Sequence, residues 1–178
     1  MSNTNEQKGN YYIIADHLRT TIFALADGAD FAPKGRGYIL KKLVKRAVLL
    51  SFFFNFSPED LLMFSQKLVE VNGSFYIHLK EKESPILDNL KKEINHNFKF
   101  IQNSTHKIDI YCQKNPQKLI PAEKIFFWYD TDGIPLELIE YCLKKKGCDF
   151  SQTEFNKLLE KQKKRGKEDR EKKGVVAF

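Results

Sequence analysis

The stretch that most constrains the fold covers residues 35–50, with the sequence GRGYILKKLVKRAVLL. On a helix at 100° per residue, its apolar and basic residues fall on opposite sides. The apolar side can pack on a core and holds Leu40, Leu43, Val44, Ala47 and Val48. The basic side spans an arc of roughly 140° and holds Lys41, Lys42, Lys45 and Arg46. The pattern predicts an amphipathic helix whose outer side is a block of positive charge.

The positive charge extends upstream of this helix. Lys34 lies just before it, and Arg36 lies between two glycines. From Lys34 to Arg46 there are six basic residues and no acidic one. A face that meets only solvent usually interleaves Glu with Lys in i,i+4 pairs. Two interpretations stay open: a solvated helix with uneven charge, or a helix that contacts phosphates, since Lys and Arg neutralisation dominates nucleic-acid affinity.

The rest of the chain also predicts helices. Apolar residues recur at helical spacing over 11–27, and a cap, a proline or both open further helices at Ser57-Pro58, Ser84-Pro85, Pro121, Pro135 and Ser151. No segment alternates like a strand. We therefore predict an all-α fold, a helical bundle in two packed sub-domains. Residues 1–10 are expected to be a disordered leader, 11–115 the first sub-domain, and 116–178 the second, which ends in a charged helix.

Composition restricts the partners and the compartment. The chain has 178 residues, 42% of them hydrophobic, and a net charge of +7, which suits an acidic partner such as nucleic acid. No apolar run is long enough for a transmembrane helix, so no membrane partner is expected. Three cysteines without a CxxC pair favour free thiols in the cytoplasm. The four histidines are scattered, so no metal site is expected.

No set of residues predicts catalysis by this chain. Asp16-His17 could suggest acid–base chemistry, but the sequence places no nucleophile or second carboxylate with it, so a buried or capping role is favoured. No nucleophile-elbow spacing occurs, and no glycine-rich loop follows a strand. Trp128 and Tyr129 fall among helical apolar positions, which favours packing in the core over stacking on bases.

The segment 129–135, YDTDGIP, joins two predicted helices through a glycine and carries carboxylates in a basic chain. In one interpretation, Asp130 or Asp132 caps the helix that starts at Pro135. In the other, Asp130 accepts a hydrogen bond from a base amino group, because the shallow minor groove of RNA lets side chains reach base edges. The exocyclic amine of guanine is the donor there. Basic residues would then supply affinity and the acid would supply specificity.

Four segments together resemble alanyl-tRNA synthetases: IIADHLRTTIFALADGA (13–29), GRGYILKKLVKRAV (35–48), WYDTDGIPLELIE (128–140) and FNKLLEKQKKRGKEDR (155–170). They occur in the family's order and span nearly the whole chain. The matching region of the family is helical and follows the class II catalytic core. Residues 52–123 match the family only in helical character.

The resemblance implies recognition of the acceptor stem of alanine tRNA through a G·U wobble at the third base pair. The family's aspartate that reads this pair matches Asp130. The implied tRNA-binding residues are therefore Asp130 and the basic set Lys34, Arg36, Lys41, Lys42, Lys45 and Arg46. The family's second reader is an asparagine, and this chain has Pro33-Lys34 there. Lys34 is expected to contact a phosphate instead.

The family's ATP- and alanine-binding motifs and its editing ligands are not found in this sequence. We therefore expect a non-catalytic part of an alanine–tRNA ligase, without a cofactor of its own, that works with a catalytic domain on the same or a separate chain. ATP and alanine would bind that catalytic domain. Two alternatives stay open. Pro33 favours a sequence-indifferent RNA-binding module, and the cluster Phe52–Phe56 favours a docking domain for a separate catalytic subunit.

Overall fold

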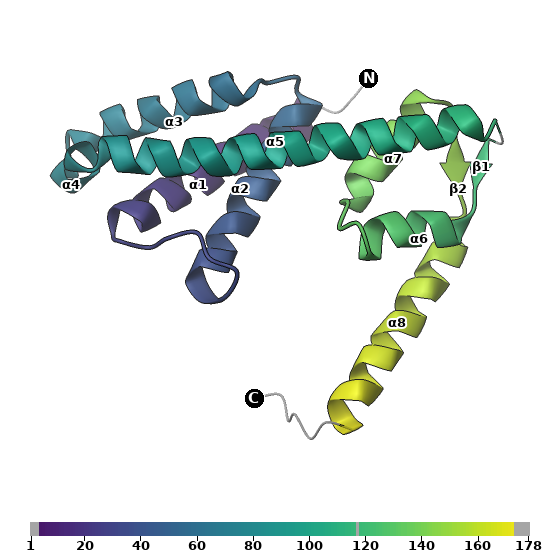
Figure 1. The fold of residues 1–178 in the computed structure, drawn as a ribbon. Helices are drawn as coiled ribbons and strands as arrows, with labels where there is room; N and C mark the ends of the chain where they lie inside the picture. Colours follow the sequence, from purple (N-terminus) through teal and green to yellow (C-terminus); the bar gives the residue numbers. More distant parts are fainter. Residues whose placement is uncertain (1–3, 117, 173–178) are drawn as a thin grey trace. The chain divides into compact units, whose positions relative to one another are not determined.

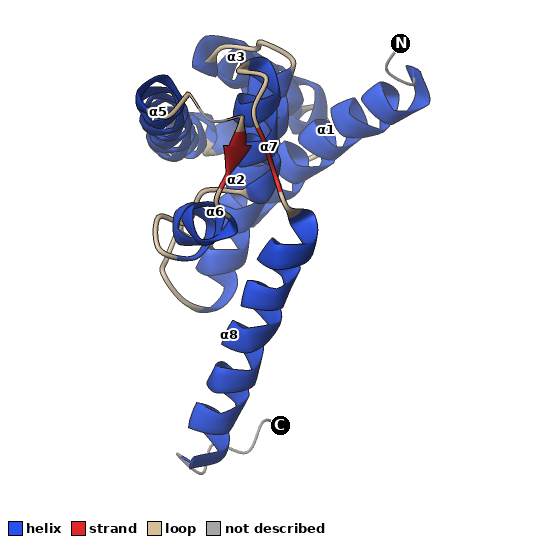
Figure 2. Ribbon diagram, turned by 90° about the vertical axis from the view of Figure 1, so that its right-hand side faces the viewer, coloured by secondary structure: helices blue, strands red, loops and turns tan. Residues whose placement is uncertain are grey.

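The computed structural model describes residues 4–116 and 118–172, with side chains for 8–116 and 118–166. These residues form eight helices and two short strands, which confirms the all-α prediction (Figures 1 and 2). The chain divides into two compact units, residues 1–101 and 102–178. The division falls inside a helix, whereas the sequence pattern suggested the loop after residue 115. Hydrophobic periodicity shows where a helix runs, but not which neighbours each of its halves contacts.

The first unit contains α1 (Thr4–Ala26), α2 (Gly35–Phe53), α3 (Pro58–Gly73), α4 (Ile77–Glu81) and the first part of α5 (Glu83–Lys114). Helices α1 and α2 pack on one another, and α3 packs against α1 and α4. The core is built from residues at the helical spacing expected from the sequence. Its most buried members are Leu18, Ile22, Val44, Ala47, Val48, Val69, Leu79, Leu90 and Ile94.

Helix α1 begins earlier than the sequence pattern predicts. Residues 4–10, expected as a disordered leader, form its first turns, and residues 1–3 lie outside the described part of the chain. No proline interrupts this segment, so the helix can continue toward the N-terminus. Tyr11 fixes α1 at this point, because its ring stacks on Phe54 with centroids 4.5 Å apart.

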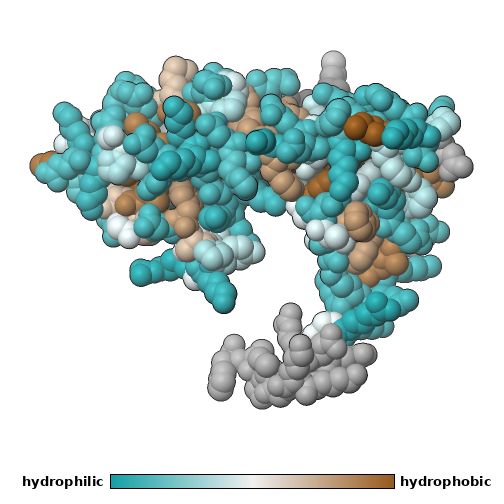
Figure 3. Space-filling model, viewed as in Figure 1, coloured by the Kyte–Doolittle hydropathy of each residue, from teal (hydrophilic) through white to brown (hydrophobic). Residues whose placement is uncertain are grey.

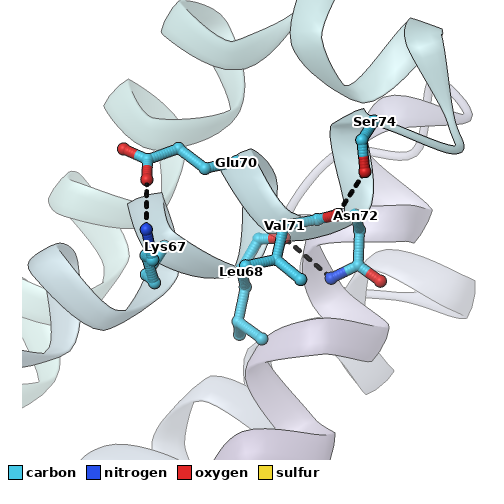
Figure 4. Close-up of polar contacts among 6 residues, drawn as sticks. All are labelled: Lys67, Leu68, Glu70, Val71, Asn72 and Ser74. Carbon is cyan, nitrogen blue, oxygen red and sulfur yellow. Dashed lines mark hydrogen bonds and ion pairs between the residues drawn. The ribbon is translucent and has the colours of Figure 1, made fainter.

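Helix α3 has a well-defined cap at each end. At its start, Asp60 N–H donates to Ser57 Oγ (3.1 Å) and Ser57 N–H donates to Asp60 Oδ2 (2.7 Å), which completes a capping box. At its end, Asn72 Nδ2 donates to the Leu68 carbonyl and Ser74 Oγ donates to the Val71 carbonyl (Figure 4). The bonds to the Asp60 N–H and the Val71 carbonyl satisfy backbone groups that a helix end leaves without partners, whereas Asn72 bonds back to a carbonyl one turn earlier.

The second unit contains the rest of α5, then β1 (Leu119–Ile120), α6 (Ala122–Asp130), α7 (Leu136–Lys145), β2 (Asp149–Phe150) and α8 (Gln152–Lys172). The strands pair in parallel, with Leu119 opposite Asp149 and Ile120 opposite Phe150. The prediction of no strands was wrong here. Each strand has two residues, too few for alternation to show, and the pairing joins segments far apart in sequence.

Two large aromatic side chains lie in the core of the second unit. Trp128 and Phe155 are both fully buried, as are Ile108, Ile120, Ile125, Leu138 and Ile139. The prediction that Trp128 packs in the core is confirmed, whereas Tyr129 is partly exposed. The face seen in Figure 3 is mostly hydrophilic, with hydrophobic residues in small groups. Among the described residues, no helix combines the length and apolarity needed to cross a membrane.

Candidate nucleic-acid interface

The first turn of α2 concentrates positive charge at a helix N-terminus. Lys34 occupies the N-cap in an extended conformation, makes no side-chain cap, and is followed by no acidic residue in the first turn. Both Lys34 and Arg36 are exposed. The N-terminal end of a helix already carries a partial positive charge and uncapped N–H groups. The arrangement is unfavourable for the isolated helix and favourable for a bound anion.

Gly37 fixes this end of α2 against the preceding loop. A Cβ at Gly37 would lie 2.2 Å from the Asp30 carbonyl oxygen and 2.6 Å from the Ala32 nitrogen. No side chain fits there, so the backbones of the loop and helix approach closely. Arg36 lines a hollow of about 620 Å³ formed by the end of α1, this loop and the start of α2.

The four basic residues farther along α2 differ in their surroundings. Lys42 is exposed, and its Nζ lies 4.6 Å from the centroid of the Tyr38 ring. Lys41, Lys45 and Arg46 are half-buried. Lys41 Nζ lies 3.9 Å from Glu93 Oε2, so this lysine also serves the fold. Lys42 is the member of the four most accessible to a ligand.

Lys45 is half-buried beside the aromatic ring of Phe100. Its Nζ is 5.0 Å from the centroid of the Phe100 ring, and burial lowers the pKa of its ammonium group, with a smaller opposing effect from Tyr38. Desolvation disfavours the charged form of a lysine. On the opposite side of α2, Leu40, Val44, Ala47 and Val48 are buried as predicted, whereas Leu43 is only partly buried.

Asp130 is the last residue of α6 and is exposed. Its place is set by the buried Trp128 before it and the buried Ile134 after it, whose N–H donates to the Trp128 carbonyl at 3.0 Å. Gly133 makes the turn with a φ of 66°. The Asp130 carboxylate accepts a hydrogen bond from Gln162 Nε2 on α8.

The neighbouring Asp132 has a different role. Its carboxylate pairs with Lys107 of α5. Helix α7 has Pro135 at its N-cap and no side-chain cap. The capping interpretation of Asp130 and Asp132 is therefore wrong, because both carboxylates bond to side chains of other helices.

Helix α8 adds a second group of positive charges. Its first turn is capped by Ser151, whose Oγ accepts from Glu154 N–H at 3.3 Å, and Phe155 anchors it in the core. Beyond Leu159 its described side chains are mostly exposed and include Lys161, Lys163, Lys164 and Arg165. Sequence reasoning treated this segment as a charged tail and missed Gln162. The only signal was the segment's resemblance to the family, which does not reveal what Gln162 contacts.

The residues expected to bind RNA belong to both units. The structure brings Lys34, Arg36, Lys41, Lys42, Lys45 and Arg46 together on and just before one helix of the first unit. Asp130 lies in the second unit, where it meets Gln162 and the basic end of α8.

Other candidate chemistry does not form a site. His17 Nδ1 lies 3.7 Å from Asp16 Oδ2 on the same helix. Among the described residues, no group of three or more His, Cys, Asp or Glu side chains could hold a metal ion. The cysteines are free thiols, and burial raises the pKa of Cys112 and of Cys142 to about 11. These two thiols are therefore protonated and unreactive at neutral pH.

Comparison with known proteins places the chain among tRNA synthetases. Residues 1–177 match the family of class II tRNA synthetases (A). The alanine–tRNA ligase of Sulfurimonas denitrificans is 31% identical over 158 residues, which are 89% of this chain and 18% of that protein. The alanine–tRNA ligases of Sulfurovum sp. and Campylobacter jejuni subsp. doylei are 32% and 29% identical over 160 and 164 residues. These matches cover 89% and 91% of this chain but only 18% and 19% of the relatives. The chain belongs to the class II tRNA synthetase (A) family.

Proposed function

We propose that this chain is the tRNA-recognition region that follows the class II catalytic core of an alanyl-tRNA synthetase. In this role it binds the acceptor stem of alanine tRNA and contributes to aminoacylation in the cytoplasm without catalysing it. ATP and alanine bind the catalytic domain, which is its protein partner. The observation that carries the proposal is the exposed Asp130 carboxylate, held by Gln162 in a chain of net charge +7.

Phosphate contacts are assigned to the first unit. Lys34 and Arg36 meet the N-terminal end of α2, where the helix dipole and the uncapped N–H groups also favour an anion. Lys41, Lys42, Lys45 and Arg46 extend this basic surface over the following turns. Contacts of this kind fix the position of the stem and carry no sequence information. The arrangement supports binding to any acceptor stem with a strong dependence on salt.

Base recognition is assigned to Asp130. A G·U wobble pair leaves the exocyclic amine of guanine without a pairing partner in the minor groove. A carboxylate accepts that hydrogen bond and cannot donate one, so it suits an amine and not a carbonyl. Pro33 stands where the family's second reader is found, so Asp130 carries the readout, and Lys34 contributes a phosphate contact.

The test compares two substitutions on two stems. Asp130→Asn should reduce the preference for a G·U stem over a G·C stem by roughly 1–3 kcal/mol, the size of one base contact. Lys42→Ala should weaken binding to both stems equally and lower the salt slope by about one. Fluorescence anisotropy with acceptor-stem minihelices measures both effects. An unchanged preference in Asp130→Asn would reject the readout, and a loss confined to one stem in Lys42→Ala would reject the phosphate role.

A second candidate function is docking onto the catalytic domain through the apolar cluster near Phe52–Phe56. The cluster is not fully buried: Phe56 is 37% exposed. A hollow of about 320 Å³ lies beside it, lined by Tyr11, Ile14, Phe56, Asp60, Leu61, Met63 and Phe64. Met63→Asp should weaken binding to a separately produced class II catalytic core, measured by calorimetry, while stem binding stays unchanged. Equal binding by the variant and the parent chain would reject this function.

A further inference from the structure

Asp130 lies at an unfavourable place for a carboxylate. It ends α6, and no basic residue occupies the last turn of that helix. The C-terminal end of a helix carries a partial negative charge, which repels an acidic side chain. Its unpaired carbonyl groups cannot donate hydrogen bonds to the carboxylate. Water can solvate this exposed carboxylate, and α8 adds a protein donor in Gln162.

The chemistry of the two groups fixes the orientation of the amide. A carboxylate only accepts hydrogen bonds, so Gln162 must turn its Nε2 toward Asp130 and its Oε1 away. The bond uses Asp130 Oδ1. Oδ2 then keeps its lone pairs for a ligand, and the amide nitrogen keeps a second hydrogen. An asparagine or a protonated carboxyl at position 130 could also donate a hydrogen bond, so it would not restrict its partners to donors.

The packing of α8 sets which of its residues reaches Asp130. Phe155 is fully buried, and its ring meets that of Tyr129 edge-on with centroids 5.7 Å apart. Gln162 follows Phe155 by seven residues, close to two full turns, so both lie on the same side of α8. The buried phenylalanine thus holds the helix in the rotation that directs Gln162 to the end of α6.

Basic residues flank this pair on α8. Arg165 follows Gln162 by three residues and Lys161 precedes it by one, and both are exposed. Residues three apart are neighbours on a helix surface. A phosphate beside the recognised base pair would therefore meet a cation on the helix that carries Gln162. The surroundings suit an anionic ligand and not a second acid.

We propose that Gln162 is a positioning residue for base-pair recognition: it holds the Asp130 carboxylate with Oδ2 presented to the guanine amine. The inference rests on the proposed function and extends it to α8. A carboxylate already held in its binding orientation loses less rotational freedom when the stem binds. Loss of Gln162 should therefore reduce the preference for the G·U stem by about threefold to tenfold, the range that one immobilised side chain accounts for. Binding to the G·C stem should hardly change.

The experiment uses the 178-residue chain and the two minihelices. Gln162→Met keeps the side-chain length and removes the donor, and Gln162→Ala serves as a second variant. Gln152→Met is the matched control, because Gln152 lies on the same helix and bonds only to Asn156 among the contacts the structure gives it. Circular dichroism and the thermal midpoint establish that each variant folds. We expect a reduced preference in both Gln162 variants and full preference in Gln152→Met.

Two further arms separate positioning from a general structural role. In a double-mutant cycle, adding Gln162→Met to Asp130→Asn should cause little further loss, because both substitutions remove the same contact. Gln162→Glu should lose the preference at neutral pH, where two carboxylates face each other. It should regain part of that preference as the pH falls, since a protonated carboxyl can donate to Asp130.

The outcomes distinguish the two proposals. If the parent chain prefers the G·U stem, Asp130→Asn loses that preference and Gln162→Met keeps it, the role of Gln162 is wrong and the proposed function stands. Equal weakening on both stems by Gln162→Met would also overturn the positioning role. If the parent chain shows no preference at all, the base readout fails, and the role of Gln162 fails with it.

Discussion

The backbone of Gly37 lies against the loop that precedes α2. A methyl group there would lie 2.2 Å from the Asp30 carbonyl oxygen and 2.6 Å from the Ala32 nitrogen. Both are backbone atoms, so they cannot move aside as a flexible side chain would. We expect Gly37→Ala to destabilise the first unit by roughly 1–3 kcal/mol, the usual cost of overpacking. Urea denaturation followed by circular dichroism measures the change. The first turn of α2 should also bind RNA less well, because its position depends on this contact.

Gly9 provides the matched control for this prediction. It lies within α1, and a Cβ there would meet nothing within 4 Å. Gly9→Ala should stabilise the chain by about 0.5–1 kcal/mol, because alanine loses less freedom than glycine when a helix forms. Equal effects of the two substitutions would contradict the special role of Gly37.

Asp130 and Gln162 show how far single residues can be predicted. Asp130 stood out because a carboxylate at a helix junction of a basic chain is chemically specific and matches a family motif. Gln162 did not, because its role depends on a contact with a residue 32 positions away. The basic residues of α2 were identified by type, but periodicity could not show that Lys41 pairs with Glu93 or that burial lowers the pKa of Lys45.

The start of α3 predicts a pH dependence of stability. Hydrogen bonds from Ser57 N–H and Ser57 Oγ lower the pKa of the Asp60 carboxyl below its usual 3.8. The charged carboxylate therefore stabilises the fold above its usual pKa, and this contribution is lost as the pH falls through the lowered value. The stability difference between the parent chain and Asp60→Asn should be largest at neutral pH and shrink in acid. Denaturation at several pH values measures it.

Two variants complete the test of this cap. Ser57→Ala should destabilise the chain by about 1 kcal/mol at neutral pH, as expected for a lost N-cap. Glu59→Gln removes an acid from the same first turn and leaves the capping box intact. It should therefore lower the free energy of unfolding by less than Asp60→Asn does. A stability difference for Asp60→Asn that does not change with pH would contradict the account.

Helix starts were the most predictable elements because their signals are local. Ser57, Pro121 and Ser151 mark the starts of α3, α6 and α8 within one or two residues. The two strands were missed, because β1 and β2 pair across 30 residues and have no local pattern. The early start of α1 was missed because residues 1–10 are polar, and polar composition alone does not distinguish a helix turn from a disordered leader.

The two units divide the proposed task. The first unit carries the basic residues of α2, and the second carries Asp130, Gln162 and the basic end of α8. The chain's net charge of +7 favours association with any RNA, and in the proposed function one carboxylate supplies the selection. The sequence indicates both parts of this proposal, through the cluster of basic residues and through the motif at Asp130. The boundary between the units, within α5, could not be predicted from the sequence, because it depends on tertiary contacts and not on periodicity.

The most direct test is the binding of the unmodified chain to G·U and G·C acceptor-stem minihelices over a range of salt concentrations. Phosphate contacts set the slope of log affinity against log salt, and base recognition sets the distance between the two lines. We predict two steep parallel lines, with the G·U stem bound more tightly by roughly 1–3 kcal/mol at every salt concentration. Superimposed lines would contradict recognition of the wobble pair, and flat lines would contradict phosphate binding by α2.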